Sequence, residues 1–166
     1  MKNIFVLKFI IFFALSIGMM TQLQAATADA NVRIKLQGKK TDNTDKRVSI
    51  KQIEAIGLIE VKAYNPYEKK SDVYTGVLMN KFVKHFAKPG VKEMALSAID
   101  DYTITFTSSE WENMRIVIAT RVNGKYIGYD EKGPLRIIFP DYDTSKKIYQ
   151  NILPKWMWMI NKVNFK

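Results

Sequence analysis

Alternation of apolar and polar side chains predicts most of the strands in this chain. Tyr102, Ile104 and Phe106 alternate with threonines, a period of two that is typical of a strand with one buried face. Strand patterns also occur in five further runs, at residues 32–36, 58–64, 94–98, 135–139 and 156–165. The run 116–119 is apolar on both faces, so we expect it in the centre of a sheet, and we expect 32–36 at an edge.

Helical patterns are few and short. Leu78, Phe82 and Phe86 recur every four residues, which predicts an amphipathic helix over 77–87. Capping patterns or apolar spacing indicate three smaller helical segments, at residues 49–57, 109–112 and 144–151. Asn123-Gly124 is typical of a two-residue hairpin turn. Many short strands with few helices favour an α+β fold with a mixed β-sheet or barrel-like core.

The N-terminal residues 1–25 have the three parts of a secretory signal peptide. Lysines precede an apolar run over 9–20, and small residues around Ala25 form a cleavage pattern. A permanent membrane anchor is the alternative, but a span needs about 20 apolar residues and two glutamines end this run early. We therefore expect export to the periplasm, cleavage near Ala25 and a single domain over 26–166.

Composition narrows the possible chemistry. The 166 residues include no cysteine, which excludes a thiolate as a nucleophile or as a metal ligand. The formal net charge is +10, but the basic residues are scattered along the chain, so nucleic acid is not an expected partner. A solvated basic surface is the ordinary interpretation. The alternative is that some of this charge receives an anionic ligand or faces an acidic membrane surface.

Candidate catalytic groups are sparse. His85 is the one histidine, and its place beside Phe82 and Phe86 favours a partly buried structural role over a triad or a metal site. Asp100-Asp101 has the composition of a carboxylate pair, but neighbours in a strand point to opposite faces. A turn before Tyr102 explains the pair equally well. The sequence predicts no catalytic constellation.

Five segments occur in an order that resembles a known family. They are Tyr74-Thr75-Gly76-Val77-Leu78, Ala98-Ile99-Asp100-Asp101-Tyr102, Ala119-Thr120-Arg121 with Asn123-Gly124, Lys132-Gly133-Pro134-Leu135-Arg136 continuing to Pro140, and Trp156-Met157-Trp158. They resemble a Gly-Val start of a helix, an Asp-Gly-Tyr element, a hairpin, a Gly-Pro-x-Arg element and a closing Trp-containing strand of the sulfite-oxidase-like superfamily. The resemblance covers about residues 58–165 and implies that superfamily's molybdopterin-binding fold.

Two departures from the family pattern bear on function. The molybdenum enzymes of the superfamily hold the metal through a cysteine near the strand that corresponds to 58–64. Because this chain has no cysteine, the soft thiolate bond to the metal cannot form. Asp101 stands where the family often has glycine. The resemblance therefore implies a pocket that binds a free pterin rather than the molybdenum cofactor, with no metal and no catalysis.

A partner is also implied. Small periplasmic members of this superfamily bind a free pterin and signal to a membrane-bound enzyme of cyclic di-GMP turnover. Similarity to them implies a pterin sensor that docks on the periplasmic region of an inner-membrane receptor. Two alternatives remain open: a molybdopterin-dependent oxidoreductase with an atypical metal site, and a ligand-free periplasmic adaptor whose pocket is filled by side chains.

Polar residues of these segments are the expected ligand contacts. Asp100 would accept hydrogen bonds from the amino-pyrimidine edge of a pterin, and Arg121 and Arg136 would meet its carbonyl edge or an anionic tail. A surface ion pair is the alternative for Arg136. Lys132 and Gly133 belong to the same motif, in which Gly133 is expected to shape a backbone turn.

Aromatic residues would provide the stacking platform. Tyr102, Trp156 or Trp158 would lie against the face of the ring. Because alternate residues of a strand share a face, core packing is the favoured role for the two tryptophans and ligand stacking is the alternative.

Overall fold

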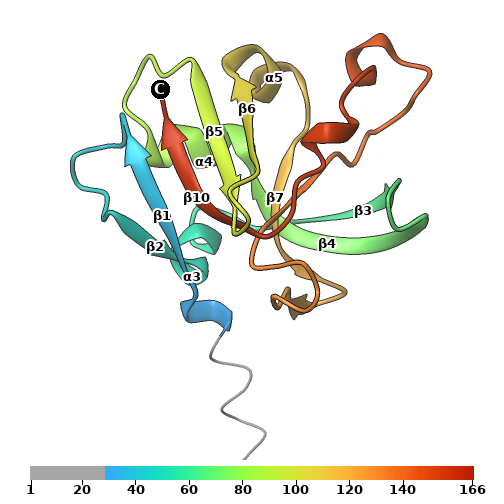
Figure 1. The fold of residues 1–166 in the computed structure, drawn as a ribbon, viewed down its shortest axis with the longest axis horizontal. Helices are drawn as coiled ribbons and strands as arrows, with labels where there is room; N and C mark the ends of the chain where they lie inside the picture. Colours follow the sequence, from blue (N-terminus) through green and yellow to red (C-terminus); the bar gives the residue numbers. More distant parts are fainter. Residues whose placement is uncertain (1–28) are drawn as a thin grey trace, which may run out of the picture.

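The computed structural model describes residues 29–166, and the predicted signal peptide with its cleavage near Ala25 lies outside the described residues. Within the described residues, ten strands form two five-stranded sheets. Figure 1 shows how the chain passes through them. The first sheet has the order β2 (Arg47–Ser49), β1 (Arg33–Gly38), β10 (Ile160–Phe165), β5 (Glu93–Ala98) and β6 (Thr103–Thr107). The second contains β3 (Ile59–Asn65), β4 (Lys70–Leu78), β7 (Val117–Val122), β8 (Lys125–Tyr126) and β9 (Arg136–Ile138).

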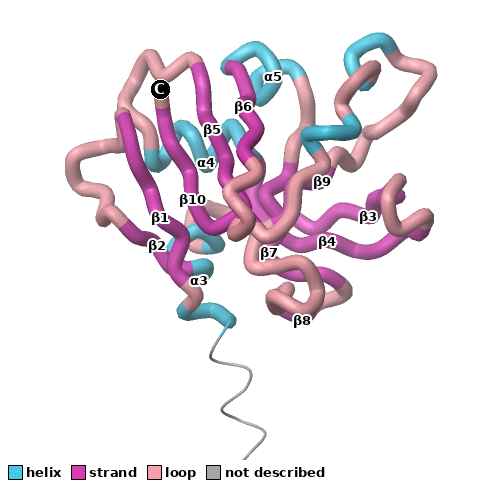
Figure 2. The backbone as a smooth tube through the Cα atoms, in the orientation of Figure 1, coloured by secondary structure: helices cyan, strands magenta, loops and turns pink. Residues whose placement is uncertain are grey.

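The helices are short, and Figure 2 shows them in cyan around the two sheets. They are η1 (Asp29–Asn31), α3 (Ile50–Glu54), α4 (Met79–Phe86), α5 (Ser108–Asn113), η2 (Lys147–Tyr149) and η3 (Leu153–Lys155). In the first sheet β1 and β10 pair in parallel and the other pairs are antiparallel. The predicted α+β class with a mixed sheet is confirmed, and the two sheets stay separate rather than closing into a barrel.

One apolar core lies between the sheets. Phe82 of α4 packs against Phe165 of β10, with ring centroids 6.2 Å apart, and Phe106 of β6 lies 6.4 Å from Phe139. All four rings are buried. Aromatic burial of this size stabilises a domain by several kcal/mol, which suits a chain with no cysteine for disulfides. Within residues 29–166 no helix is long and apolar enough to cross a membrane.

Most strands lie where the sequence predicts them. In β3 the alternation holds, since Val61 and Ala63 are buried and Glu60 is exposed. β7 is central as expected, with β4 on one side and β8 and β9 on the other. Asn123 and Gly124 join β7 to β8 with positive φ angles of 48° and 80°. The capping box at the start of α3 is also confirmed.

β1 is not the edge strand that its alternation suggested. β2 pairs with it on one side and β10 pairs with it on the other. The chain pattern shows only that one face of β1 is polar, and it contains no information about the partner strands. The edge strand on this side of the first sheet is the three-residue β2, and β6 forms the other edge.

The expected start of a helix at Tyr74–Leu78 is wrong, because this segment completes β4. Gly76 lies where β4 meets β7 closely: a Cβ there would lie 2.2 Å from the Ile118 carbonyl oxygen. The helix therefore begins only at Met79, and its Phe82 and Phe86 are buried as predicted.

Three further expectations need correction. His85 is exposed on α4 rather than partly buried, with its ring against the edge of Phe86. α5 is capped by Thr107 and Glu110 rather than by Ser109 and Glu112, although Trp111 packs in the core as predicted. Over 144–151 the chain forms only the single 3-10 turn η2.

β10 begins later than predicted. Trp156 to Met159 form an irregular segment before Ile160, and Met159 has a φ of 56°. Trp156 and Trp158 therefore do not share one face of a strand, which changes the role each can have.

Candidate functional site

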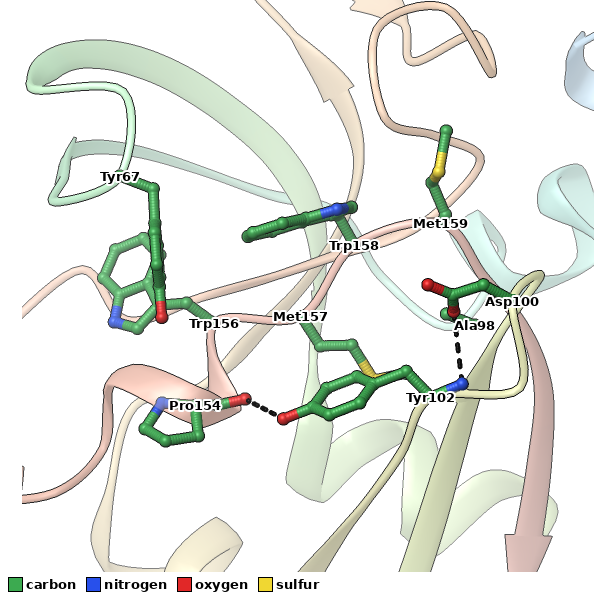
Figure 3. Close-up of a pocket in the computed structure, with 9 residues that line it drawn as sticks. All are labelled: Tyr67, Ala98, Asp100, Tyr102, Pro154, Trp156, Met157, Trp158 and Met159. Carbon is green, nitrogen blue, oxygen red and sulfur yellow. Dashed lines mark hydrogen bonds between the residues drawn. The ribbon is translucent and has the colours of Figure 1, made fainter.

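The candidate site is a pocket of about 250 Å³ between three connecting segments. The turn between β3 and β4, the turn between β5 and β6 and the segment from Pro154 to Met159 meet at this point (Figure 3). Nine residues line the pocket: Tyr67, Ala98, Asp100, Tyr102, Pro154, Trp156, Met157, Trp158 and Met159. The volume lies just below the roughly 300–1,000 Å³ of sites for drug-sized ligands, so it suits one small ring system.

The turn between β5 and β6 holds Asp100 at the pocket. Asp101 has a φ of 64°, a left-handed conformation that glycine adopts more easily than other residues. The Tyr102 N–H donates to Asp100 Oδ1 at 3.1 Å, and the Ala98 N–H donates to the Tyr102 carbonyl at 2.9 Å. The Asp100 carboxylate is thus oriented by the backbone, and it is exposed and able to accept further hydrogen bonds.

Two aromatic rings form the walls of the pocket. Figure 3 shows Trp158 and Tyr102 on opposite sides, with Asp100 at one end and Tyr67 at the other. Tyr67 packs edge-on against Trp158, with ring centroids 5.3 Å apart, and its hydroxyl donates to the Leu153 carbonyl at 3.0 Å. These contacts fix the Trp158 ring from one side, so that its other surface can face the pocket.

Trp156 has the other role, that of a core residue. It is 3% exposed and packs against Phe139 and Tyr142, with centroid distances of 5.5 and 5.6 Å. Its Nε1–H is buried and has no hydrogen-bond partner among the described residues. The structure therefore separates the two tryptophans: Trp156 supports the base of the pocket, and the half-buried Trp158 is available for stacking.

Lys132 and Arg136 lie beside this pocket in a charged cluster around Glu68. Arg136 Nη2 donates to Glu68 Oε1 at 2.7 Å, and Lys132 Nζ donates to the same oxygen at 3.3 Å. Burial alone would raise the pKa of Glu68, but the charges and hydrogen bonds of Arg136 and Lys132 outweigh it and hold that pKa below its usual 4.5. The Lys132 ammonium also lies 5.2 Å from the centroid of the Trp158 ring, a cation–π contact that joins the cluster to the pocket.

Arg121 is held elsewhere, in a network that ties α3 to the β7–β8 hairpin. Its guanidinium donates two hydrogen bonds to the Glu54 carboxylate, at 2.9 and 2.7 Å, and lies over the Tyr126 ring. Thr120 and Tyr126 hydroxyls also donate to Glu54. The structure does not bring Arg121 to the pocket lined by Asp100 and Trp158.

The Glu54 network predicts an acid-sensitive contribution to stability. Burial tends to raise the pKa of Glu54, but hydrogen bonds from Arg121, Thr120 and Tyr126 prevail and lower it from 4.5. A carboxylate with a lowered pKa stabilises the fold above its unfolded pKa and loses that effect as the pH falls through its folded pKa. We expect Glu54→Gln to lower the melting temperature at pH 7 and to differ progressively less from the wild type below about pH 4.5. Thermal unfolding followed by circular dichroism between pH 7 and 3 tests this, and a constant difference across that range would contradict it.

Gly133 shapes the backbone beside the cluster, as predicted. A Cβ at this position would lie 1.8 Å from the Ile127 carbonyl oxygen. Its N–H donates to the Gly128 carbonyl at 2.6 Å and closes the loop before β9. Gly133 acts through this close approach of two backbone segments.

Sequence reasoning missed several contributors to the site. Tyr67, Met157 and Met159 line the pocket, and Glu68 organises the adjacent cluster. The turn at Asn65-Pro66-Tyr67 is visible in the sequence, but nothing there places it against residues about 90 positions later. In the described part of the chain no group of three His, Cys, Asp or Glu side chains could hold a metal ion.

Comparison with known proteins adds a fold assignment. No family model matches the chain, and no curated protein matches it. Among solved structures, the chain is similar to the sulfane dehydrogenase SoxCD from Paracoccus pantotrophus, with a TM-score of 0.59 and 11% identity over 83% of this chain. The fold is sulfite-oxidase-like.

The similarity is one of architecture. The match covers 39% of the dehydrogenase chain, so this protein spans well under half of that relative. The neighbour is an oxidoreductase by name. At this level of identity the sulfite-oxidase-like fold is shared, and the chemistry of each protein depends on its own site residues.

Proposed function

We propose that this protein is a non-catalytic periplasmic pterin-binding protein of the sulfite-oxidase-like superfamily, which signals its ligand state to a membrane-bound enzyme of cyclic di-GMP turnover. The observation that carries the proposal is the pocket between Trp158 and Tyr102 with the Asp100 carboxylate at its end. The other parts of the proposal follow from the resemblance of the sequence to small periplasmic members of that superfamily.

The pocket chemistry fits a flat heterocycle with donors on one edge. The faces of a pterin are apolar and polarisable, so they stack well on indole and phenol rings. Its amino-pyrimidine edge presents neighbouring N–H groups, and an ionised carboxylate that accepts both forms charge-assisted hydrogen bonds. Asp100 already has a backbone N–H on one oxygen, which leaves the remaining acceptor sites for the ligand.

The same residues do not fit a thiolate-bound molybdenum cofactor. The strand that would supply the metal ligand, β3, carries Val61, Lys62 and Ala63, and the chain contains no cysteine. The pocket carboxylate would also repel the phosphate of a molybdopterin. These features support binding without redox turnover over an oxidoreductase with an atypical metal site.

An open pocket supports a sensor over a ligand-free adaptor. An adaptor would have its former site filled by a large side chain such as Trp156 or Tyr102. Trp156 instead packs in the core, and Tyr102 stands at the wall of a cavity of about 250 Å³ with half of its surface exposed. Tyr67, Ile99 and Leu153 are exposed around the same region, and apolar side chains grouped at a surface are typical of a protein-docking site.

Calorimetric titration with reduced and oxidised pterins tests the ligand. We expect saturable binding to the wild type and a loss of about 10- to 100-fold in affinity for Asp100→Asn, since hydrogen bonds to a charged group contribute about 1.5–3 kcal/mol. Trp158→Ala should weaken binding about tenfold or more through lost stacking. Asp101→Asn is the matched control, because Asp101 is a neighbouring exposed carboxylate that does not line the pocket.

The same variants test the signalling half of the proposal in cells. Asp100→Asn should shift cellular cyclic di-GMP as deletion of the protein does, whereas Asp101→Asn should behave as the wild type. If the protein is folded and calorimetry detects no binding of any pterin, the ligand-free adaptor becomes the better hypothesis. Pterin binding without any effect of Asp100→Asn on cyclic di-GMP would remove the signalling role and keep the ligand.

A further inference from the structure

The outer face of the first sheet carries a row of positive charges. The register places Lys35 of β1 directly opposite Arg47 of β2 on one side and opposite Lys162 of β10 on the other. Arg33 lies two residues before Lys35 on the same exposed face. The opposite face packs in the core, where Phe165 of β10 meets Phe82 of α4.

This row is electrostatically unfavourable for the folded protein by itself. Like charges at directly opposed cross-strand positions destabilise a sheet, and here two such pairs share Lys35. Among the described residues neither Lys35 nor Arg47 forms an ion pair. Lys162 has one acidic neighbour, Asp101, at 3.8 Å, and that side chain is 92% exposed, so the pair is screened by solvent. Because this row of cations does not stabilise the folded protein, it suggests that the face binds a separate anionic molecule or surface.

The rest of the face consists mostly of small or hydrogen-bonding groups, and it includes one exposed acid, Glu93 of β5. The row continues across β5 and β6 with Ser97 and Thr103, whose hydroxyls lie 2.8 Å apart. The next row contains Gln37, Asn164, Ala95 and Thr105. More lysines meet at the end of the sheet: Lys39 donates its N–H to the Phe165 carbonyl, and the Lys92 N–H donates to the Lys166 carbonyl. These rows contain no aromatic or large aliphatic side chain.

We propose that the outer face of the first sheet binds an anionic lipid surface. Protein interfaces have an aromatic or aliphatic centre and few lysines, whereas this face carries Lys35 and Lys162 on the inner strands β1 and β10 and has no apolar anchor in these rows. Its cations are spread over three adjacent strands and the strand ends, which matches a broad sheet of anionic headgroups. Each such cation strengthens membrane association about fivefold, and the attraction decays within one Debye length.

Vesicle sedimentation tests the proposal on the protein purified after export, with its N-terminus checked by mass spectrometry because the apolar run 9–20 would itself insert. The wild type should bind vesicles of phosphatidylcholine with phosphatidylglycerol and should dissociate from them as the salt concentration is raised. It should not bind vesicles of phosphatidylcholine alone. The variant Lys35→Gln/Arg47→Gln/Lys162→Gln should lose about 100-fold in partitioning, from three cations at about fivefold each.

A variant of equal net charge separates this face from general basicity. Lys62→Gln/Lys125→Gln/Lys147→Gln removes three exposed lysines located elsewhere and should change partitioning less than fivefold. The face variant should melt no lower than the wild type, since its like-charge pairs are gone. An equal loss in both variants, or equal binding to neutral vesicles, would overturn the proposal. Retention on immobilised polyglutamate without any vesicle binding would overturn it in favour of an acidic polypeptide.

Discussion

Glu68→Ala is expected to lower the free energy of unfolding by about 3–5 kcal/mol, because it leaves a buried cation without its partner. The Arg136 side chain is 6% exposed, and Glu68 is the one carboxylate that forms an ion pair with it among the described residues. Total stabilities of domains are about 5–15 kcal/mol, so this change should shift the urea unfolding midpoint strongly at pH 7.

Two further variants identify the cause. Glu68→Ala/Arg136→Met removes both charges and should recover much of the lost stability, because buried pairs replaced by apolar residues are often neutral or better. Glu112→Ala removes an exposed acid and should stay within about 0.5 kcal/mol of the wild type. If the double variant is as unstable as Glu68→Ala, the loss does not arise from the unpaired arginine.

Gly133→Ala is expected to destabilise the fold by about 3 kcal/mol or more, since overpacking against backbone cannot relax by side-chain rotation. The added Cβ would lie 1.8 Å from the Ile127 carbonyl oxygen and 2.8 Å from that of Gly128. The loop between them must open before the methyl group fits. Urea unfolding followed by far-ultraviolet circular dichroism measures the effect.

Gly124→Ala is the matched control. Gly124 has a φ of 80° and nothing lies within 4 Å of its added Cβ, so it should lose about 1–2 kcal/mol from the left-handed backbone alone. Equal losses in the two variants would show that the close contact at Gly133 is relieved cheaply. A large loss at Gly133 would also mean that weakened ligand binding by that variant reports on the backbone and not on a contact with the ligand.

Local patterns predicted the elements whose residues bury one face. β3 and β6 follow from alternation, and α4 follows from the spacing of Phe82 and Phe86. β5 was predicted as a short strand, and the residues on both of its faces are buried. The nine-residue β4 was missed because its first half is polar. Its pairing with β3 and β7 depends on tertiary structure, which the local sequence pattern does not show. The irregular segment before β10 was also missed, because Met159 has a left-handed backbone conformation that methionine rarely adopts and that the sequence therefore does not predict.

The sequence predicted several of the residues that line the candidate site, but it did not predict how they are arranged. Asp100, Tyr102, Trp156 and Trp158 come together as lining residues of one pocket. Arg121 does not join them, because Glu54 lies within reach of its guanidinium, and an acid so far away in sequence gives no local sign of this. Whether Asp100 and Trp158 contact a pterin remains a prediction for the titration described above.

The parallel pairing of β1 and β10 has a consequence for how the chain acquires its structure. β10 lies between β1 and β5, yet it is made long after both of them as synthesis proceeds. Until residues 160–165 emerge, β1 and β5 have no common neighbour, and the backbone edges that pair with β10 stay unpaired. Non-local pairings of this kind slow folding and lengthen the exposure of apolar strands. We therefore expect a chaperone that binds the growing or translocating chain to stay bound longest at these two strands.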